Sequence, residues 1–227
     1  MRNRIIQITS LSLNILIVVF TMISFLYYQF PDKSGYVVGL SILKYFTMDS
    51  NILVAVSSAI LIPYNILNIT KNRFYIPRYA SILKYMGTVS VALTFLTVIF
   101  FLGPTQGFNN MYNNVSFFMH MATPILSIIS YTLFEGIELD QRVTITSIIP
   151  MVIYGMVYMT NVVYKYRWND FYGFNINGKW RITFLIMLLV TYLIGVLIYF
   201  LPIIFNRIMN NIQKRKRNKQ SINNSNN

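Results

Sequence analysis

Six apolar segments, each long enough to cross a lipid bilayer, dominate this 227-residue chain. A transmembrane helix needs about 20 apolar residues to cross roughly 30 Å of hydrocarbon. The sequence therefore predicts an all-α, polytopic membrane protein whose transmembrane helices pack in one bundle. The six predicted helices cover approximately residues 5–29, 42–69, 80–102, 115–134, 143–164 and 182–205.

Composition narrows the class of protein further. Hydrophobic residues make up 55% of the chain and charged residues 11%, whereas an average soluble domain has roughly 25% charged residues. The net charge of +13 is better explained by membrane topology than by nucleic-acid binding, because the basic residues lie mainly between and after the apolar segments. The absence of cysteine excludes disulfides, cysteine-ligated zinc and cysteine nucleophiles. With one histidine and scattered carboxylates, we expect no metal site and no cofactor.

The basic residues also predict the orientation of the chain. With the N-terminus inside, 13 of the 19 Lys and Arg residues, Lys84 among them, lie on the inner side and the remaining 6 on the outer side. This asymmetry predicts a multi-pass protein of the cell membrane with both termini in the cytoplasm. The loop between the fifth and sixth segments argues against this orientation, because it carries four basic residues outside. Richness in Ile, Asn, Tyr and Lys, with few Ala, suggests a bacterial source.

The last residues of the chain form a unit of their own. Residues 1–209 hold the six predicted helices, and residues 210–227 form a basic tail that ends in Ser and Asn. Its composition predicts a disordered cytoplasmic segment. We expect it to contact anionic lipid headgroups, at roughly 1 kcal/mol for each basic residue near the surface.

Polar side chains open two of the apolar segments. Thr47 lies about one and a half turns into the second segment, and His120 about one and a half turns into the fourth. Both segments start at the predicted outer face, so these residues should lie at similar depth. Ser50 and Asn51 share the face of Thr47 by i, i+3 and i+4 spacing. Asp49 points roughly 200° away from Thr47, which makes a simple Thr47–His120–Asp49 triad geometrically awkward.

The chemistry that this pair favours is acyl transfer. A neutral imidazole, with a pKa of about 6.5, can take the proton of a threonine hydroxyl at physiological pH and so create a nucleophile. Asn51 or Ser50 could donate a hydrogen bond to the developing oxyanion. Three further residues could orient the imidazole or complete the site, namely Asp49, Asn161 and Tyr158.

Each of these features also has an ordinary structural explanation. Thr and Ser in membrane helices usually bond their own i−4 carbonyl, and a lone histidine commonly joins two helices. Glu135, Glu138 and Asp140 fall in the inner loop after the fourth segment, where we expect a solvated turn. Trp168 and the tyrosines around it suit an aromatic belt at the membrane interface or a lid over the outer pocket.

Two short motifs carry a family resemblance. The stretch Phe46-Thr47-Met48-Asp49-Ser50-Asn51 on the second segment and the stretch His120-Met-Ala-Thr-Pro124 on the fourth, within six segments, resemble the androgen-induced-gene / androgen-dependent-TFPI-regulating-protein family and its bacterial six-helix relatives. The eukaryotic members are hydrolases that cleave fatty acid esters of hydroxy fatty acids with a membrane-embedded Thr and His. The resemblance implies that Thr47 is the nucleophile and His120 the base.

Two function classes follow from these observations. The leading hypothesis is an intramembrane threonine hydrolase of fatty acyl esters, with membrane lipids and a lipid-like substrate as its partners and no nucleic acid. The alternative is a non-catalytic small-molecule-binding or transport module, such as the substrate-capturing subunit of a vitamin transporter. Against the alternative, the first segment has no Ala or Gly for partner docking. A third possibility is a structural membrane protein without a ligand.

Overall fold

Long helices account for almost all of the fold. The structure, a computed structural model, describes residues 2–30, 39–71, 75–135 and 139–225, and these residues contain helices and loops but no strand. Five helical stretches are long and apolar enough to cross a membrane. They run over Arg4–Tyr27, Phe46–Lys71, Arg78–Gln106, Gln141–Tyr164 and Trp180–Arg215. The predicted all-α fold is therefore confirmed for the described residues, and the five long apolar helices are those of a membrane protein by length and composition.

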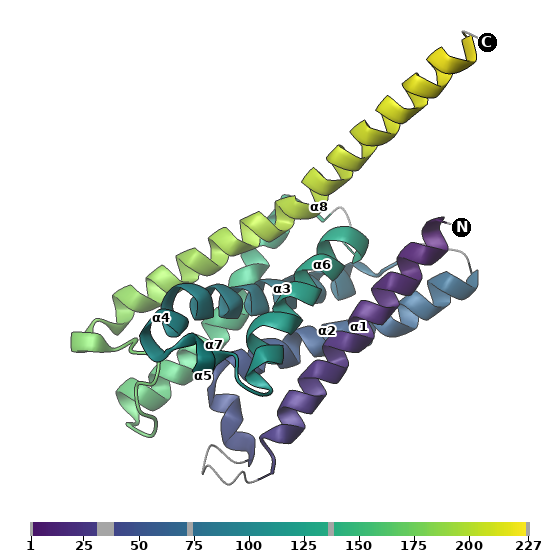
Figure 1. The fold of residues 1–227 in the computed structure, drawn as a ribbon. Coiled ribbons are helices and arrows are strands. Elements are labelled where there is room, and N and C mark those ends of the chain that lie inside the picture. Colours follow the sequence, from purple (N-terminus) through teal and green to yellow (C-terminus); the bar gives the residue numbers. More distant parts are fainter. Residues whose placement is uncertain (1, 31–38, 72–74, 136–138, 226–227) are drawn as a thin grey trace.

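Figure 1 shows the order of the helices along the chain. In the first half they are α1 (Arg2–Tyr27), η1 (Gly39–Lys44), α2 (Phe46–Lys71), α3 (Arg78–Thr97), η2 (Val98–Leu102), α4 (Gly103–Gln106) and α5 (Phe108–Met111). In the second half they are η3 (Phe118–Ala122), α6 (Thr123–Ser130), η4 (Tyr131–Glu135), η5 (Gln141–Ile148), α7 (Ile149–Met159), η6 (Thr160–Tyr164), η7 (Ile176–Gly178) and α8 (Trp180–Ser225).

The fourth predicted segment is helical but irregular. Residues 115–134 were expected to form one transmembrane helix, and the structure places η3, α6 and η4 there in succession. Both η3 and η4 are π-helical turns, which are rare and recur at functional positions. This stretch is not among the five membrane-length helices, so a sixth crossing stays a prediction.

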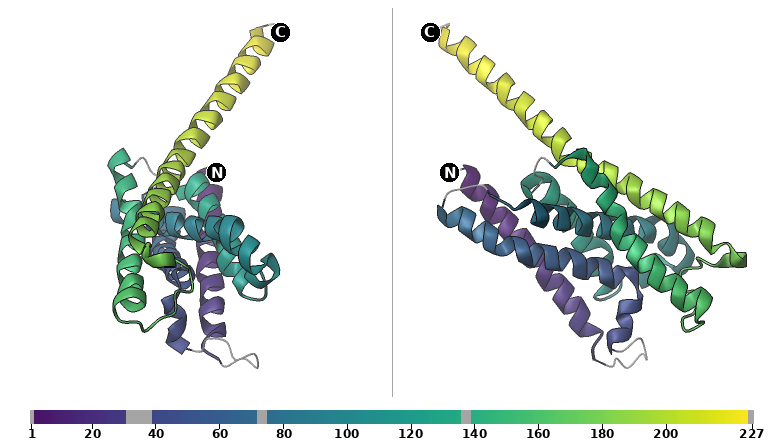
Figure 2. Two further views of the ribbon diagram at one scale, coloured as in Figure 1. Left: turned by 90° about the vertical axis from the view of Figure 1, so that its left-hand side faces the viewer. Right: turned by 180° about the vertical axis from the view of Figure 1, so that it is seen from behind.

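Helix α3 lies in the middle of the assembly. It packs against α2, α6 and α8, while α1 packs along α2. Gly87 permits a close approach of α2 and α3, because a Cβ atom at this position would lie 2.8 Å from the Cα of Val54. Both ends of the described chain lie at the same end of the helical assembly, and the two further views agree (Figure 2).

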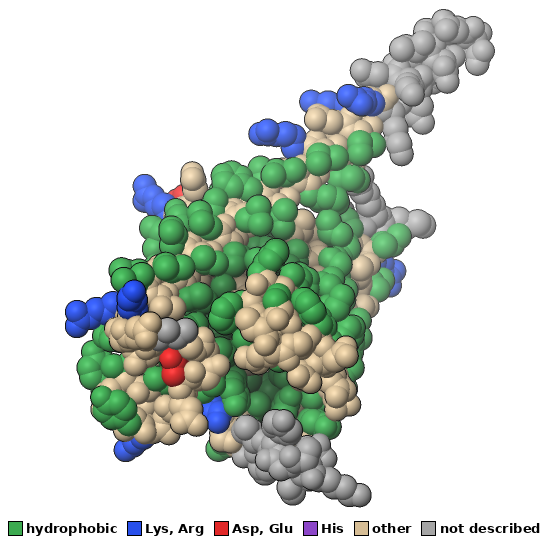
Figure 3. All heavy atoms as spheres, turned by 60° about the vertical axis from the view of Figure 1, so that its left-hand side comes forward, with side chains coloured by type: hydrophobic (Ala, Val, Ile, Leu, Met, Phe, Trp, Pro, Cys, Tyr) green, Lys and Arg blue, Asp and Glu red, His purple; other side chains and the backbone are tan. Residues whose placement is uncertain are grey.

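The outer surface is apolar along most of its length. On α8 the side chains of Leu185, Leu189, Leu193 and Leu197 are each more than half exposed. Hydrophobic side chains cover most of the face shown in Figure 3, and Lys and Arg gather toward its margins. Such a surface suits contact with lipid tails flanked by headgroups.

The C-terminal tail differs from the sequence prediction. A disordered tail was expected from residue 210, whereas α8 continues to Ser225 and projects beyond the other helices (Figure 1). Residues 203–225 contain no Gly or Pro and are rich in Lys, Arg and Gln, which are good helix formers. A helix already nucleated in the bundle therefore extends through them at little cost.

Candidate functional site

A large cavity lies at the end of the helical assembly away from the two termini (Figure 1). Its volume is about 810 Å³, within the range of roughly 300–1,000 Å³ found for small-molecule sites. Its wall includes the end of α1, the start of α2, the turns around α4 and α5, the start of η3 and the loop before α8. We refer to it as the main cavity.

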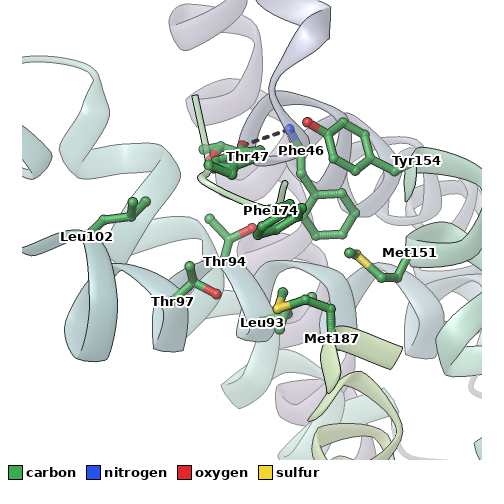
Figure 4. A pocket seen from close by; sticks show the side chains of 11 residues that line it. Phe46, Thr47, Leu93, Thr94, Thr97, Leu102, Met151, Tyr154, Phe174 and Met187 are labelled. Carbon is green, nitrogen blue, oxygen red and sulfur yellow. Dashed lines mark hydrogen bonds between the residues drawn. The ribbon is translucent and has the colours of Figure 1, made fainter. Parts of the chain in front are cut away.

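Thr47 and His120 both line the main cavity. Thr47 stands in the first turn of α2, and His120 stands in the π-helical turn η3. The two residues, 73 positions apart, thus reach one cavity. Thr47 also borders a second, much smaller space of about 30 Å³ (Figure 4).

The imidazole of His120 is held by the backbone. Its Nδ1 atom lies 2.6 Å from the carbonyl oxygen of Met111, at the end of α5. A carbonyl only accepts hydrogen bonds, so Nδ1 carries a proton and donates it. In the neutral ring the other nitrogen, Nε2, is then unprotonated and can accept a proton.

Tyr172 joins the loop before α8 to the start of α2. The backbone N–H of Phe46 donates to the Tyr172 hydroxyl at 3.1 Å, and the Thr47 side chain also interacts with this hydroxyl. Burial raises the pKa of Tyr172 to about 12, although hydrogen bonds with Tyr154, Thr47 and Phe46 act in the opposite direction. The phenol therefore stays protonated at neutral pH, and it lines the main cavity beside Thr47.

Asp170 organises the loop that carries Tyr172. One carboxylate oxygen accepts from the Tyr158 hydroxyl at 2.9 Å and from the Phe174 N–H at 2.8 Å. The other accepts from the Asn175 N–H at 2.8 Å. In turn the Tyr158 hydroxyl accepts from the backbone N–H of Tyr172 at 3.1 Å. The aromatic loop predicted as a belt or a lid thus has a fixed structure over one side of the main cavity.

The residues predicted to share the face of Thr47 are buried, but the Ser50 hydroxyl and the Asn51 amide nitrogen are engaged in hydrogen bonds, whereas the Asn51 Oδ1 atom has no partner among the described residues. The Asn51 amide nitrogen donates to the carbonyls of Thr47 at 2.7 Å and Met119 at 3.2 Å. The Ser50 hydroxyl contacts the Thr47 carbonyl and the Thr94 hydroxyl, each at 3.0 Å. Neither residue lines the main cavity. In this arrangement both amide protons of Asn51 are already used within the fold.

The three residues offered as further members of the site lie elsewhere. Asp49 is half-buried on α2 but does not line the main cavity, in agreement with its predicted direction. The Asn161 amide donates to the Val157 carbonyl at 2.8 Å, and the Tyr158 hydroxyl donates to Asp170. The group that orients His120 is the Met111 carbonyl instead, a backbone atom that side-chain patterns do not reveal.

A second polar centre lies deep between the helices, and the sequence interpretation missed it. Lys84 Nζ lies 3.5 Å from Glu135 Oε2, and the two side chains are 0% and 2% exposed. The same ammonium donates to Asn14 Oδ1 and Ser58 Oγ, both at 2.8 Å. Lys84 is one of the inner-side basic residues from which the topology is predicted, whereas the structure buries it.

One oxygen of the Glu135 carboxylate accepts several hydrogen bonds, and the other faces the Lys84 ammonium. Glu135 Oε1 accepts from Ser10 at 2.8 Å, from Ser130 at 2.7 Å and from the Asn14 amide. The prediction of a solvated turn is therefore wrong for Glu135, because Lys84 and these donors replace water. Asp140 is exposed, as predicted, and accepts from the Arg142 N–H; Glu138 lies outside the described residues. A lysine within a predicted membrane helix was itself a signal, since it requires a buried partner.

Comparison with known proteins identifies no relative of this chain. No family model, no curated protein and no solved structure matches it. Functional interpretation therefore depends on the geometry of the main cavity and on the residues around it.

Proposed function

We propose that this protein is an intramembrane hydrolase of fatty acyl esters in which Thr47 is the nucleophile and His120 the base. The observation that carries the proposal is the Nδ1 contact of His120 with the Met111 carbonyl, 2.6 Å long, in the cavity that Thr47 also lines. That contact leaves Nε2 as the basic nitrogen, and a general base of this kind typically contributes 10²–10⁴-fold to the rate.

The reaction proceeds in two steps. His120 Nε2 takes the hydroxyl proton of Thr47 while Thr47 Oγ1 attacks the ester carbonyl carbon. As the tetrahedral intermediate collapses, the carbon–oxygen bond to the alcohol breaks and the alkoxide leaves with the proton from Nε2. Water then attacks the acyl-threonine with Nε2 as base, and the proton returns to Thr47 Oγ1. The products are an alcohol and a fatty acid.

Tyr172 is the better placed donor for the oxyanion. Its protonated hydroxyl borders the main cavity beside Thr47, whereas the amide protons of Asn51 are held by two carbonyls. A donor already fixed in a buried site stabilises developing charge without reorganisation. We therefore assign the oxyanion contact to Tyr172 in place of Asn51 or Ser50.

The topology that fits this function has six crossings in a single bundle. The two chain ends share one end of the bundle (Figures 1 and 2), which an even number of crossings gives. The sixth crossing is the π-interrupted stretch of η3, α6 and η4. The excess of Lys and Arg beside the termini favours the cytoplasm for that end, which puts the main cavity in the outer half of the membrane.

Purified protein tests the proposal directly. Thr47→Ala and His120→Ala should each lower hydrolysis of a fluorogenic acyl ester at least about 10²-fold, and a fluorophosphonate probe should label wild type at Thr47 only. Thr160→Ala is the matched control, since Thr160 bonds the Met156 carbonyl on α7 and lines neither cavity. Unchanged turnover in both Thr47→Ala and His120→Ala, with intact folding, would contradict the proposal.

The alternative function is a non-catalytic binding or transport module. The specific observation in its favour is the size of the main cavity, about 810 Å³. A small molecule that purifies with the protein, together with no probe labelling of Thr47, would support the module and not the hydrolase.

A further inference from the structure

The wall of the main cavity carries no formal charge in the described part of the chain. Its described lining residues are aromatic, aliphatic, hydroxyl or amide side chains together with His120, and they include no Lys, Arg, Asp or Glu. This is informative in a protein with a net charge of +13, because none of the basic residues of the described part of the chain lines the cavity.

We infer that the main cavity takes an uncharged single-chain lipid with a hydroxyl-bearing head, such as a monoacylglycerol. The inference deepens the proposed function and rests on it for the reaction, since it names the class of ester that Thr47 would cleave. It concerns binding as well as turnover, so the two can be tested apart.

Amide side chains at one part of the wall supply recognition of the head. Gln106, Asn110 and Asn113 line the main cavity from the α4–α5 region, and all three are exposed. An amide presents donors and an acceptor without net charge, which matches hydroxyl and ester groups. Lipid heads that carry a carboxylate or a phosphate need cations that these amides do not provide.

Apolar side chains at another part of the wall suit an acyl chain. Ile42, Met48, Leu102 and Met119 line the main cavity and are buried. They come from four different elements. A volume of about 810 Å³ is near the upper end of single-ligand sites, which favours one chain over the several chains of a membrane phospholipid.

Charge discrimination follows from the same wall. An anionic head brought into the main cavity would lose water without gaining a cation from the described wall, and burial of an unpaired charge is strongly unfavourable. One cation lies beside the wall: Lys44 Nζ is 5.0 Å from the Tyr45 ring centroid and 5.8 Å from that of Phe171. It faces aromatic rings and does not line the cavity. An effect of Lys44 on the binding of an anionic ligand would therefore contradict the inference.

The test is a binding competition in detergent micelles between two ligands with the same alkyl chain. A 1-O-alkylglycerol ether, which cannot be hydrolysed, should bind wild-type protein at least about 10-fold more tightly than the fatty acid carboxylate. Gln106→Leu with Asn113→Leu should weaken binding of the ether at least about 3-fold. Asn109→Leu, an exposed neighbour that does not line the cavity, should leave it unchanged. Equal or tighter binding of the carboxylate, and especially its loss in Lys44→Gln, would overturn the inference.

Turnover separates this inference from the proposed function. A monoacylglycerol and an ester that bears a free carboxylate are compared on wild type and Thr47→Ala. Preferred ether binding without Thr47-dependent turnover would contradict the hydrolase function and support a protein that only binds an uncharged lipid. Thr47-dependent cleavage that favours the carboxylate ester would support the hydrolase function and contradict the inference about an uncharged lipid.

Discussion

The ammonium of Lys84 and the carboxylate of Glu135 lie 3.5 Å apart between buried helices. Around them, Ser10 and Asn14 on α1, Ser58 on α2 and Ser130 on α6 form hydrogen bonds with the ammonium or with Glu135 Oε1. This ion pair and its partners, the polar centre, join helices that are far apart in the sequence. In an apolar surrounding, two charges are tolerated only when each satisfies the other.

Removal of one charge from the polar centre should destabilise the protein. Lys84→Met leaves the Glu135 carboxylate buried without its cation, a change that typically costs about 3–5 kcal/mol. The double variant Lys84→Met with Glu135→Leu removes both charges and should recover a large part of that loss. Thermal unfolding in micelles measures the stability of the single and the double variant, and Lys165→Met, at an exposed position, is the control. A double variant no more stable than Lys84→Met would show that the pair does not act as a unit.

A side chain at Gly87 should push α2 and α3 apart. Gly87→Ala puts a Cβ atom 2.8 Å from the Cα of Val54, and a backbone atom cannot move aside as a side chain can. Overpacking of this kind costs about 1–3 kcal/mol, and Gly87→Ser should cost more. The free energy of unfolding in SDS titration checks both variants, and wild-type stability in Gly87→Ala would contradict the close approach.

Loss of the Tyr172 hydroxyl should slow hydrolysis more than it weakens binding. Tyr172→Phe removes the proposed oxyanion donor, which typically costs about 10²–10³-fold in kcat, with KM nearly unchanged. Tyr166→Phe is the matched control, since Tyr166 is 84% exposed. Steady-state kinetics on an acyl ester supply both constants. A Tyr172→Phe variant with wild-type kcat and intact folding would show that the Tyr172 hydroxyl is not the oxyanion donor.

The sequence predicted the features that depend on local pattern. Apolar length identified the membrane helices, and i, i+3, i+4 spacing on α2 gave the shared, buried face of Ser50 and Asn51. Thr47 and His120, which we expect at similar depth, line the same cavity. Helix length and the faces of a helix can be predicted because bilayer thickness and the helical repeat fix them before any tertiary contact forms.

The features that the sequence did not predict depend on contacts between distant segments. The Met111 carbonyl that orients His120 belongs to the backbone, and Glu135 is buried only because Lys84, Ser10 and Ser130 surround it. The roles expected of Asn51 and Tyr158 also depend on such contacts. The Asn51 amide nitrogen donates to two backbone carbonyls and the Tyr158 hydroxyl donates to Asp170. Residue type and spacing do not reveal these partners.

The Asp170 carboxylate should set the order of the loop that carries Tyr172. Asp170→Ala leaves two backbone N–H groups and the Tyr158 hydroxyl without their acceptor, at about 1–3 kcal/mol for each buried group left unpaired. We expect faster tryptic cleavage after Lys165 and Arg167, together with a fall in ester hydrolysis, while the rest of the protein stays folded. Asp140→Ala is the matched control, because its side chain is 52% exposed. Equal cleavage rates in Asp170→Ala and wild type would show that the loop is held by its aromatic packing alone.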